Sequence, residues 1–256
     1  MKQPLAYVHP EAQVADNVVI EPFVTIDKNV VIEEGTRIGS NVTILEGAHI
    51  GKNCKIFPGA VIAAVPQDLK FRGEKTIVKI GDNTTIRECV TVNRGTAAKG
   101  VTEIGDNCLI MAYAHIAHDC KIGNNCIITN ACQLAGEVVV DDFAILGGMT
   151  AVHQFVHIGK HVMIQGGSLI GKDVPPYVIM AGNPVEYHGV NAVVLQQHKN
   201  TSERVLRHIA NAYRLIYQGN FSLQDAVQKI VDQVPMSEEI ENIVAFVKES
   251  KRGIVK

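Results

Sequence analysis

The amino-acid sequence predicts a β protein with a helical tail: a parallel β-helix of six-residue repeats over residues 1–188 and a small C-terminal helical domain over residues 189–256. Three observations support this. Large aliphatic residues recur at every sixth position from Val8 to Ile170, with two interruptions. The fifth position of these hexads is mostly small, and beyond about residue 190 the apolar spacing becomes helical. Helices repeat every 3.6 residues and half-buried strands every second residue, so a period of six indicates an internal repeat.

Each hexad is expected to form one short strand and one corner. The aliphatic first residue and the small fifth residue point inward, while Gly, Asn and Asp between them suit corners because they tolerate positive φ angles. Three hexads make one 18-residue coil of a triangular prism, and successive coils pair as parallel strands. The aliphatic series is long enough for about eight coils, or roughly 40 Å at a strand spacing of about 4.8 Å.

Two polar segments interrupt the repeat, at about residues 63–79 and 97–103. We expect both to leave the prism wall as loops, and loops on a rigid scaffold commonly carry function.

The helical tail begins at about residue 190. Apolar residues at helical spacing predict one helix from Val205 to Ile216, a second opened by Ser222, and a third opened by Ser237 that closes at Gly253. Serine accepts hydrogen bonds from the unpaired N–H groups of a first helical turn, so it favours such starts.

Composition narrows the function classes. The chain has 256 residues, 46% of them hydrophobic, and a formal net charge of −2 without a basic run, which argues against nucleic acid as a partner. It has neither a signal-peptide core nor an apolar stretch of about 18 residues, so we expect a cytoplasmic protein without stable membrane insertion. Five of the six cysteines occupy the small inward position, which predicts reduced core residues: Cys54, Cys108, Cys120, Cys126 and Cys132.

Residues 18 apart should stack on successive coils, and one edge of the prism then gathers polar side chains. They are His115, His118, Asp119, Gly136, Glu137, His153 and Gln154. A neutral His118 suits removal of a hydroxyl proton, Asp119 can orient its ring, and Gly136 can offer a backbone N–H to a developing oxyanion. The stack by itself leaves open both an acyltransferase site and a set of ordinary surface residues.

Motifs along nearly the whole chain resemble the UDP-N-acetylglucosamine acyltransferase (LpxA) family of lipid A biosynthesis. They lie in both loops, along the histidine edge and in the tail. The matching segments are 67–70, 94–96, 115–120, 140–145, 147–155, 173–177 and 211–217.

The resemblance implies a left-handed hexapeptide prism and a homotrimer with active sites between neighbouring subunits. It implies transfer of an (R)-3-hydroxyacyl group from acyl carrier protein to the 3-hydroxyl of UDP-N-acetylglucosamine, the first step of lipid A biosynthesis, with no metal and no cofactor. His118 matches the family's general base, Gly136 the oxyanion residue, and Gly166 the acyl-length ruler, where a glycine leaves room for a longer chain. The positions matching substrate contacts are Gln67, Asp68, Lys70, His115, His153, Gln154 and Asn191.

Two positions depart from the family pattern. Glu137 stands where the family commonly has histidine, and we expect its carboxylate to accept a hydrogen bond from a sugar hydroxyl. The segment 195–199 reads Leu-Gln-Gln-His-Lys where the family usually has an arginine pair. Bidentate guanidinium donors to a diphosphate are therefore missing near Gln197 and His198. Lys199, Arg204 or a neighbouring subunit is expected to compensate.

Three other interpretations stay open. Residues 181–184 form the kind of turn that acetyl-coenzyme A-dependent hexapeptide acetyltransferases carry. A trimeric zinc enzyme of the carbonic-anhydrase type would use histidines such as His115 and His118, although the separation of His118 from His153 along the axis, about 10 Å, exceeds a shared metal site. A trimeric scaffold would use the histidine edge for packing alone.

Overall fold

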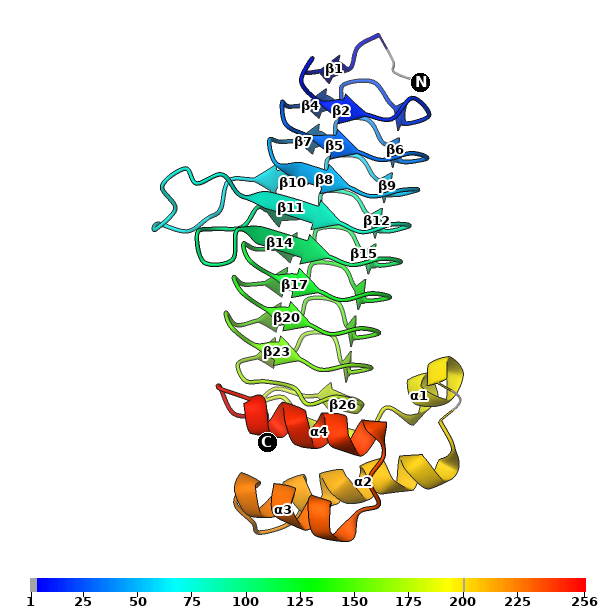
Figure 1. Ribbon diagram of the computed structural model, residues 1–256, viewed down its shortest axis with the longest axis vertical. Helices are drawn as coiled ribbons and strands as arrows, with labels where there is room; N and C mark the ends of the chain where they lie inside the picture. Colours follow the sequence, from blue (N-terminus) through cyan, green and yellow to red (C-terminus); the bar gives the residue numbers. More distant parts are fainter. Residues whose placement is uncertain (1–3, 200) are drawn as a thin grey trace.

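The computed structural model describes residues 4–199 and 201–256, without the side chains of residues 198 and 199. The chain winds into a tall triangular prism that starts at the N-terminus, and the helices lie at its opposite end (Figure 1). Twenty-five short strands, β1 to β25, each contain one aliphatic residue of the hexad series. The predicted repeat is therefore the prism wall.

The strands form three parallel sheets, which we call the first, second and third faces. The first face consists of β1 (Tyr7–Val8), β4 (Thr25–Ile26), β7 (Thr43–Ile44), β10 (Val61–Ala64), β13 (Thr91–Asn93), β16 (His115–Ile116), β19 (Gln133–Leu134), β22 (Ala151–Val152) and β25 (Leu169–Ile170). The second face consists of β2 (Gln13–Val14), β5 (Val31–Ile32), β8 (Ala48–Ile50), β11 (Ile77–Ile80), β14 (Val101–Ile104), β17 (Lys121–Ile122), β20 (Val139–Val140) and β23 (His157–Ile158). The third face consists of β3 (Val19–Ile20), β6 (Arg37–Ile38), β9 (Lys55–Ile56), β12 (Thr85–Ile86), β15 (Leu109–Ile110), β18 (Ile127–Ile128), β21 (Ile145–Leu146), β24 (Met163–Ile164), β26 (Val178–Ala181) and β27 (Glu186–Val190), the last antiparallel.

The core is the column of aliphatic side chains inside the prism. Ile26, Ile44 and Ile62 are completely buried on three successive coils. Burying such a side chain contributes about 1.5–3 kcal/mol. Val8 and Val14 in the first coil are only half buried because no coil covers them from above.

The corners correct one part of the sequence reasoning. Asn residues such as Asn83 and Asn107 do adopt positive φ angles, of 56° each. The glycine at the second hexad position has another role. A Cβ on Gly81 would lie 2.2 Å from Oδ1 of Asp106 on the next coil, and Gly105 meets Asn124 in the same way at 2.5 Å. These glycines are therefore required by close approach between coils rather than by their φ angles.

Both interruptions leave the prism at the edge where the first face passes into the second, which we call the loop edge. The first loop comprises residues 65–76, shorter than the expected 63–79, and the second comprises 94–100, three residues earlier than the expected 97–103. The observed bounds differ because β10 continues to Ala64 and β13 ends at Asn93. Strands β11 and β14 then pair over four residues, starting at Ile77 and Val101, and so extend the wall into the polar segments.

Four helices follow the prism: α1 (Ala192–Lys199), α2 (Glu203–Tyr217), α3 (Leu223–Gln233) and α4 (Glu238–Glu249). Ser202, Ser222 and Ser237 cap the last three through their side-chain oxygens. The expected domain boundary at residue 188 falls inside β27, and α1 adds a helix that the apolar spacing did not reveal.

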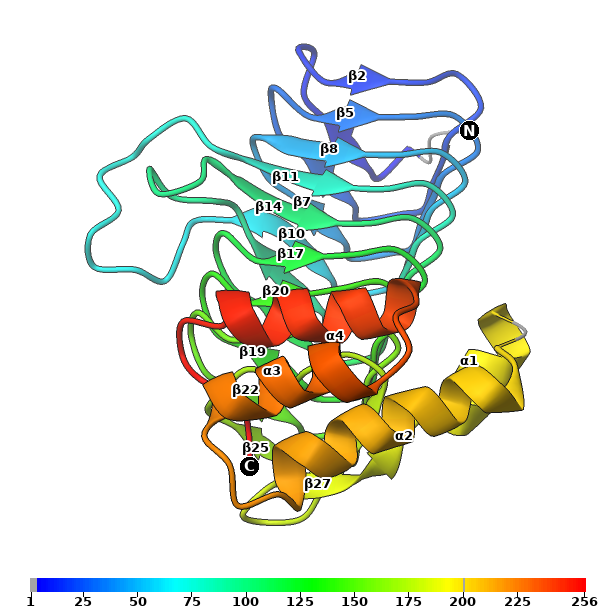
Figure 2. The same ribbon diagram turned by 60° about the horizontal axis from the view of Figure 1, so that its bottom comes forward.

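The helices cover the end of the prism that lacks a further coil (Figure 2). Helix α4 ends at Glu249, earlier than the expected Gly253, because the chain then joins the prism. The Ser250 hydroxyl donates to Asp173 at 2.6 Å and the Asp173 N–H donates to the Gly253 carbonyl at 3.0 Å. Among the helices that the structure describes, none has the length and apolar character needed to cross a membrane.

Candidate active site

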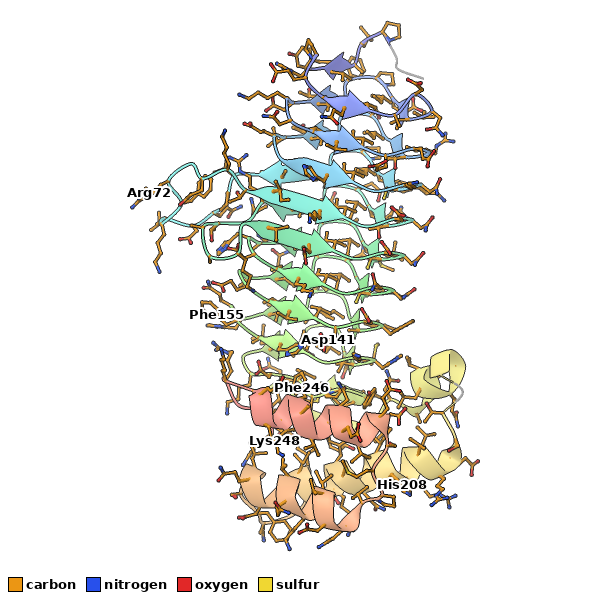
Figure 3. The ribbon with its side chains drawn as sticks, in the orientation of Figure 1. Arg72, Asp141, Phe155, His208, Phe246 and Lys248 are labelled. Carbon is orange, nitrogen blue, oxygen red and sulfur yellow. The ribbon has the colours of Figure 1, made fainter. Side chains whose placement is uncertain are left out.

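The predicted polar column lies along the loop edge. The corners after β16, β19 and β22 stack there on successive coils, and both loops leave from the same edge. Arg72 of the first loop and Phe155 of the corner after β22 accordingly lie on one side of the prism (Figure 3). The period of 18 thus brought His118, Gly136 and Gln154 together, as the sequence suggested.

His118 and Asp119 form a buried pair at the corner after β16. His118 is 8% exposed and Asp119 is fully buried, and Nδ1 of His118 lies 2.8 Å from Oδ2 of Asp119. A carboxylate accepts only, so this contact places the ring proton on Nδ1. Nε2, which has no protein partner in the described part of the chain, then carries the lone pair that a general base needs.

The second loop holds the Asp119 carboxylate in place. The Thr96 N–H donates to Oδ1 at 2.9 Å and the Thr96 hydroxyl to Oδ2 at 2.6 Å, while the Lys99 N–H donates to Oδ1 at 3.3 Å. The Asp119 N–H in turn donates to the Thr102 hydroxyl at 2.8 Å. Burial by itself raises the pKa of the Asp119 carboxyl, but the hydrogen bonds from Thr96 and His118 together outweigh it, and the pKa lies below its usual value.

Gly136 lies directly against the His118 ring. A Cβ at this position would be 2.5 Å from both Cε1 and Nε2 of His118, closer than any side chain tolerates. The Gly136 N–H has no acceptor among the described residues, while its carbonyl accepts from the Phe155 N–H at 3.2 Å. A backbone donor and a basic nitrogen therefore share one small space, which is what attack of an alcohol on an acyl carbonyl requires.

Glu137 follows Gly136 at the same corner. Its N–H donates to the His118 carbonyl at 2.9 Å, and its carboxylate Oε2 lies 4.0 Å from Nζ of Lys99. The Lys99 ammonium also donates to the Asp119 carbonyl at 3.2 Å. Sequence reasoning missed Thr96, Lys99 and Thr102. These residues could have been found from the position of the second interruption, which falls one coil before His118 on the same edge.

The other histidines lie beside this group. His115 is on the first face in β16, where its Nδ1 lies 2.7 Å from the Thr91 hydroxyl and burial lowers the pKa of its imidazole. His153 is exposed at the corner after β22, with Nδ1 3.0 Å from the Gln154 carbonyl. Gln154 is half-buried at the same corner.

The first loop, which carries Gln67, Asp68 and Lys70, projects from the prism (Figure 1). Asp68 Oδ1 accepts from the Lys70 N–H at 2.9 Å, which shapes the turn, and Gln67 and Lys70 are exposed. Asn93 anchors the base of the loop by donating to the Val65 carbonyl at 2.8 Å. Within the described part of a single chain, these three residues make no hydrogen bond or ion pair with His118.

Asn191 and Gly166 lie away from the loop edge. Asn191 is 4% exposed between β27 and α1, and its side-chain amide donates to the His161 carbonyl at 2.9 Å, so that nitrogen has a structural use. Gly166 is at a corner between the third and first faces, where a Cβ would lie 2.9 Å from the Gly148 carbonyl oxygen. Of the segment without the arginine pair, Gln197 is exposed on α1, while the side chains of residues 198 and 199 are outside the described set.

An open groove of about 900 Å³ lies on the second face, with Lys79 and Lys121 among its walls. Within the described residues, no three His, Cys, Asp or Glu side chains come together as a metal site.

The fold and this edge define a hexapeptide-repeat transferase. The family model for “Bacterial transferase hexapeptide (six repeats)” matches residues 102–136, the model for “Udp N-acetylglucosamine O-acyltransferase; Domain 2” matches residues 173–255, and “GMPPB C-terminal domain” matches residues 2–99.

Relatives cover the whole chain. An acyl-(acyl-carrier-protein)–UDP-N-acetylglucosamine O-acyltransferase from Halorhodospira halophila is 42% identical over 254 residues, covering 99% of this chain and 98% of the relative. One of the same name from Sulfurovum is 44% identical and covers 98% and 96%. The chain belongs to this family of acyltransferases.

Solved structures agree with the family assignment. LpxA from Bacteroides fragilis superposes with a TM-score of 0.97 at 49% identity and full coverage of both chains. LpxA from Acinetobacter baumannii gives 0.95 at 36% identity and covers 99% of each. The predicted left-handed hexapeptide prism with a helical tail is thereby confirmed.

Proposed function

We propose that the protein transfers an (R)-3-hydroxyacyl group from acyl carrier protein to the 3-hydroxyl of UDP-N-acetylglucosamine. One observation carries the chemistry: the His118 ring, oriented by Asp119, lies directly against the backbone of Gly136. The names of the relatives at full coverage support the two substrates and favour acyl carrier protein over coenzyme A as the donor.

In the proposed reaction, Nε2 of His118 removes the proton from the sugar hydroxyl as its oxygen attacks the acyl thioester carbonyl. The negative charge that develops on the carbonyl oxygen is stabilised by the Gly136 N–H. Collapse of the tetrahedral intermediate breaks the carbon–sulfur bond, and the proton held by His118 passes to the departing thiolate. The imidazolium formed meanwhile is stabilised by Asp119.

Binding of the substrates needs surfaces beyond the described edge of one chain. Gln67, Asp68 and Lys70 stand out from the wall, so we assign them to a cleft completed by another subunit. The third face carries an apolar stripe that suits such contact. Its half-buried members are in register on five successive strands: Leu109, Ile127, Ile145, Met163 and Ile179.

The proposal therefore includes a homotrimer. Light scattering coupled to size exclusion is expected to give about 83 kDa, three times the 27.8 kDa of the chain. Aspartate substitution of Ile145 in the stripe should shift the mass toward that of the single chain, and an unchanged trimer would place the contact elsewhere.

Product mass spectrometry tests the reaction. Incubation with UDP-N-acetylglucosamine and a ladder of 3-hydroxyacyl carrier proteins is expected to give one O-acylated sugar nucleotide, with acetyl-coenzyme A as the competing donor. The preferred length tests the prediction that Gly166 leaves room for a longer chain.

His118→Ala should lower turnover at least about a hundredfold while nucleotide binding and assembly persist. Acetyl transfer, or stoichiometric zinc in untagged protein, would contradict the proposal. The cytoplasmic location stays a prediction, which cell fractionation tests.

A further inference from the structure

Two carboxylates flank the proposed reaction centre. Asp119 is bonded to His118, and Glu137 follows the residue whose N–H is assigned to the oxyanion. Glu137 is largely shielded, with 23% of its side chain exposed. A negative charge this close to a developing oxyanion opposes the transition state, and the effect is strong where water is partly excluded.

Lys99 supplies a cation at this point. Its ammonium lies 3.2 Å from the Asp119 carbonyl oxygen, to which it donates, and 4.0 Å from Oε2 of Glu137. The Lys99 side chain is 39% exposed, so the pair with Glu137 adds little to stability. Because the ammonium lies between the corners of His118 and Gly136, it can instead balance charge at the reaction centre.

We propose that Lys99 is a positioning residue of the reaction centre: its ammonium balances the charge of Glu137, so that Glu137 stays beside the acceptor without opposing the oxyanion. This inference rests on the proposed function of the His118 edge.

The backbone and side chain of Lys99 do different things, which makes the inference testable. The Lys99 N–H donates to Asp119 Oδ1 at 3.3 Å and is kept in any substitution, as are both contacts from Thr96. Lys99→Met therefore removes the charge while it retains the loop anchor and most of the aliphatic stem.

The experiment is a double-mutant cycle in which kcat and KM are measured for wild type, Lys99→Met, Glu137→Gln and the double variant. Lys99→Met should lower kcat on the order of tenfold because Glu137 is then uncompensated. The double variant should recover most of that loss, because the uncompensated charge has been removed, and Lys99→Arg should stay close to wild type. Lys248→Met, which replaces an exposed lysine of helix α4, is the matched control and should leave kcat unchanged.

The pH profile gives an independent measure. The charged groups placed around His118 are Asp119 on its own corner, Lys99 from the second loop and Glu137 from the next coil. Loss of the cation leaves excess negative charge, which stabilises the imidazolium. The acid limb of kcat/KM should move to higher pH in Lys99→Met and return in the double variant.

The outcomes separate the two proposals. Suppose that the wild type turns over, but the losses of kcat in the two single variants simply multiply in the double variant and the acid limb does not move. That result would overturn the role of Lys99 and leave the proposed function standing. A wild type without turnover contradicts the proposed function, whereas the affinities of the four proteins for UDP-N-acetylglucosamine still decide the charge balance, because a Glu137 without Lys99 repels the nucleotide diphosphate. Circular dichroism and thermal unfolding identify a variant that fails to fold, in which case Lys99→Arg and Glu137→Gln decide.

Discussion

Replacing Asp119 with asparagine perturbs the site at its most buried polar group. The carboxylate accepts from the Thr96 N–H and hydroxyl, the Lys99 N–H and His118 Nδ1. An amide has one oxygen and one NH₂ group. In either orientation, the NH₂ group therefore faces groups that donated hydrogen bonds to the carboxylate. Each orientation of the new side chain has its own consequence.

If the NH₂ group faces His118, it donates to Nδ1 and forces the ring proton onto Nε2, the nitrogen that must act as base. Fixing the wrong tautomer in this way lowers turnover by about 10⁴ in serine proteases, so we expect a loss of about 10³–10⁴ here. If the NH₂ group faces Thr96 and Lys99 instead, buried donors oppose each other at a cost of about 1–3 kcal/mol. Unfolding should then occur a few degrees lower.

The assay follows product formation by mass spectrometry under single-turnover conditions, with a thermal melt of the same sample. Asp142→Asn is the matched control. Asp142 accepts from the Asn124 N–H at 2.7 Å at another edge of the prism, so the same chemical change should lower the melting temperature without lowering turnover. An Asp119→Asn enzyme that keeps more than about a tenth of wild-type turnover and also keeps the wild-type melting temperature would refute the reasoning for both orientations.

Four further predictions concern the same residues, the core and the position of Gly166. Gly136→Ala should lower kcat at least about a hundredfold, because its Cβ would displace the His118 ring, while the melting temperature changes little. The pKa of Asp119 is lower in the folded protein than in the unfolded chain, where it is about 3.9. Its contribution to stability is therefore present above about pH 3.9 and is lost as the pH falls through the folded value of the pKa. The difference in unfolding free energy between wild type and Asp119→Asn, measured by denaturant unfolding, should then disappear in acid. Iodoacetamide should leave Cys120 unlabelled until the protein unfolds, since burial raises the pKa of its thiol to about 12; labelling of native protein would contradict this. Gly166→Leu should shorten the preferred acyl chain, read from the product ladder.

The repeat made much of the site predictable. Because successive coils are 18 residues apart, the sequence alone places Gly136 above His118 and Gln154 one coil further. The register His115 to Gln133 to Ala151 on the first face follows the same arithmetic. The serine caps of α2 to α4 likewise depend on contacts within one helical turn, and two of them, Ser222 and Ser237, were predicted from the sequence.

The residues that sequence reasoning missed lie where the repeat stops. Thr96 and Lys99 reach Asp119 across an irregular loop, and no spacing rule gives its path. Asn191 and Gly166 were assigned through the family resemblance, and a single chain places them on other edges than His118.

By itself, then, the sequence determined the prism, its core of isoleucines and small residues, and the column of polar side chains on one edge. These follow from contacts between residues one coil apart, which a six-residue period repeats along the chain. Only the tertiary structure decided the direction of the second loop, the tautomer of His118 and the charge that faces Glu137. Those depend on the hydrogen bonds that Thr96 and the Lys99 N–H donate to the buried carboxylate of Asp119, and on the Lys99 ammonium beside Glu137. These contacts are specific to this loop and repeat nowhere in the pattern.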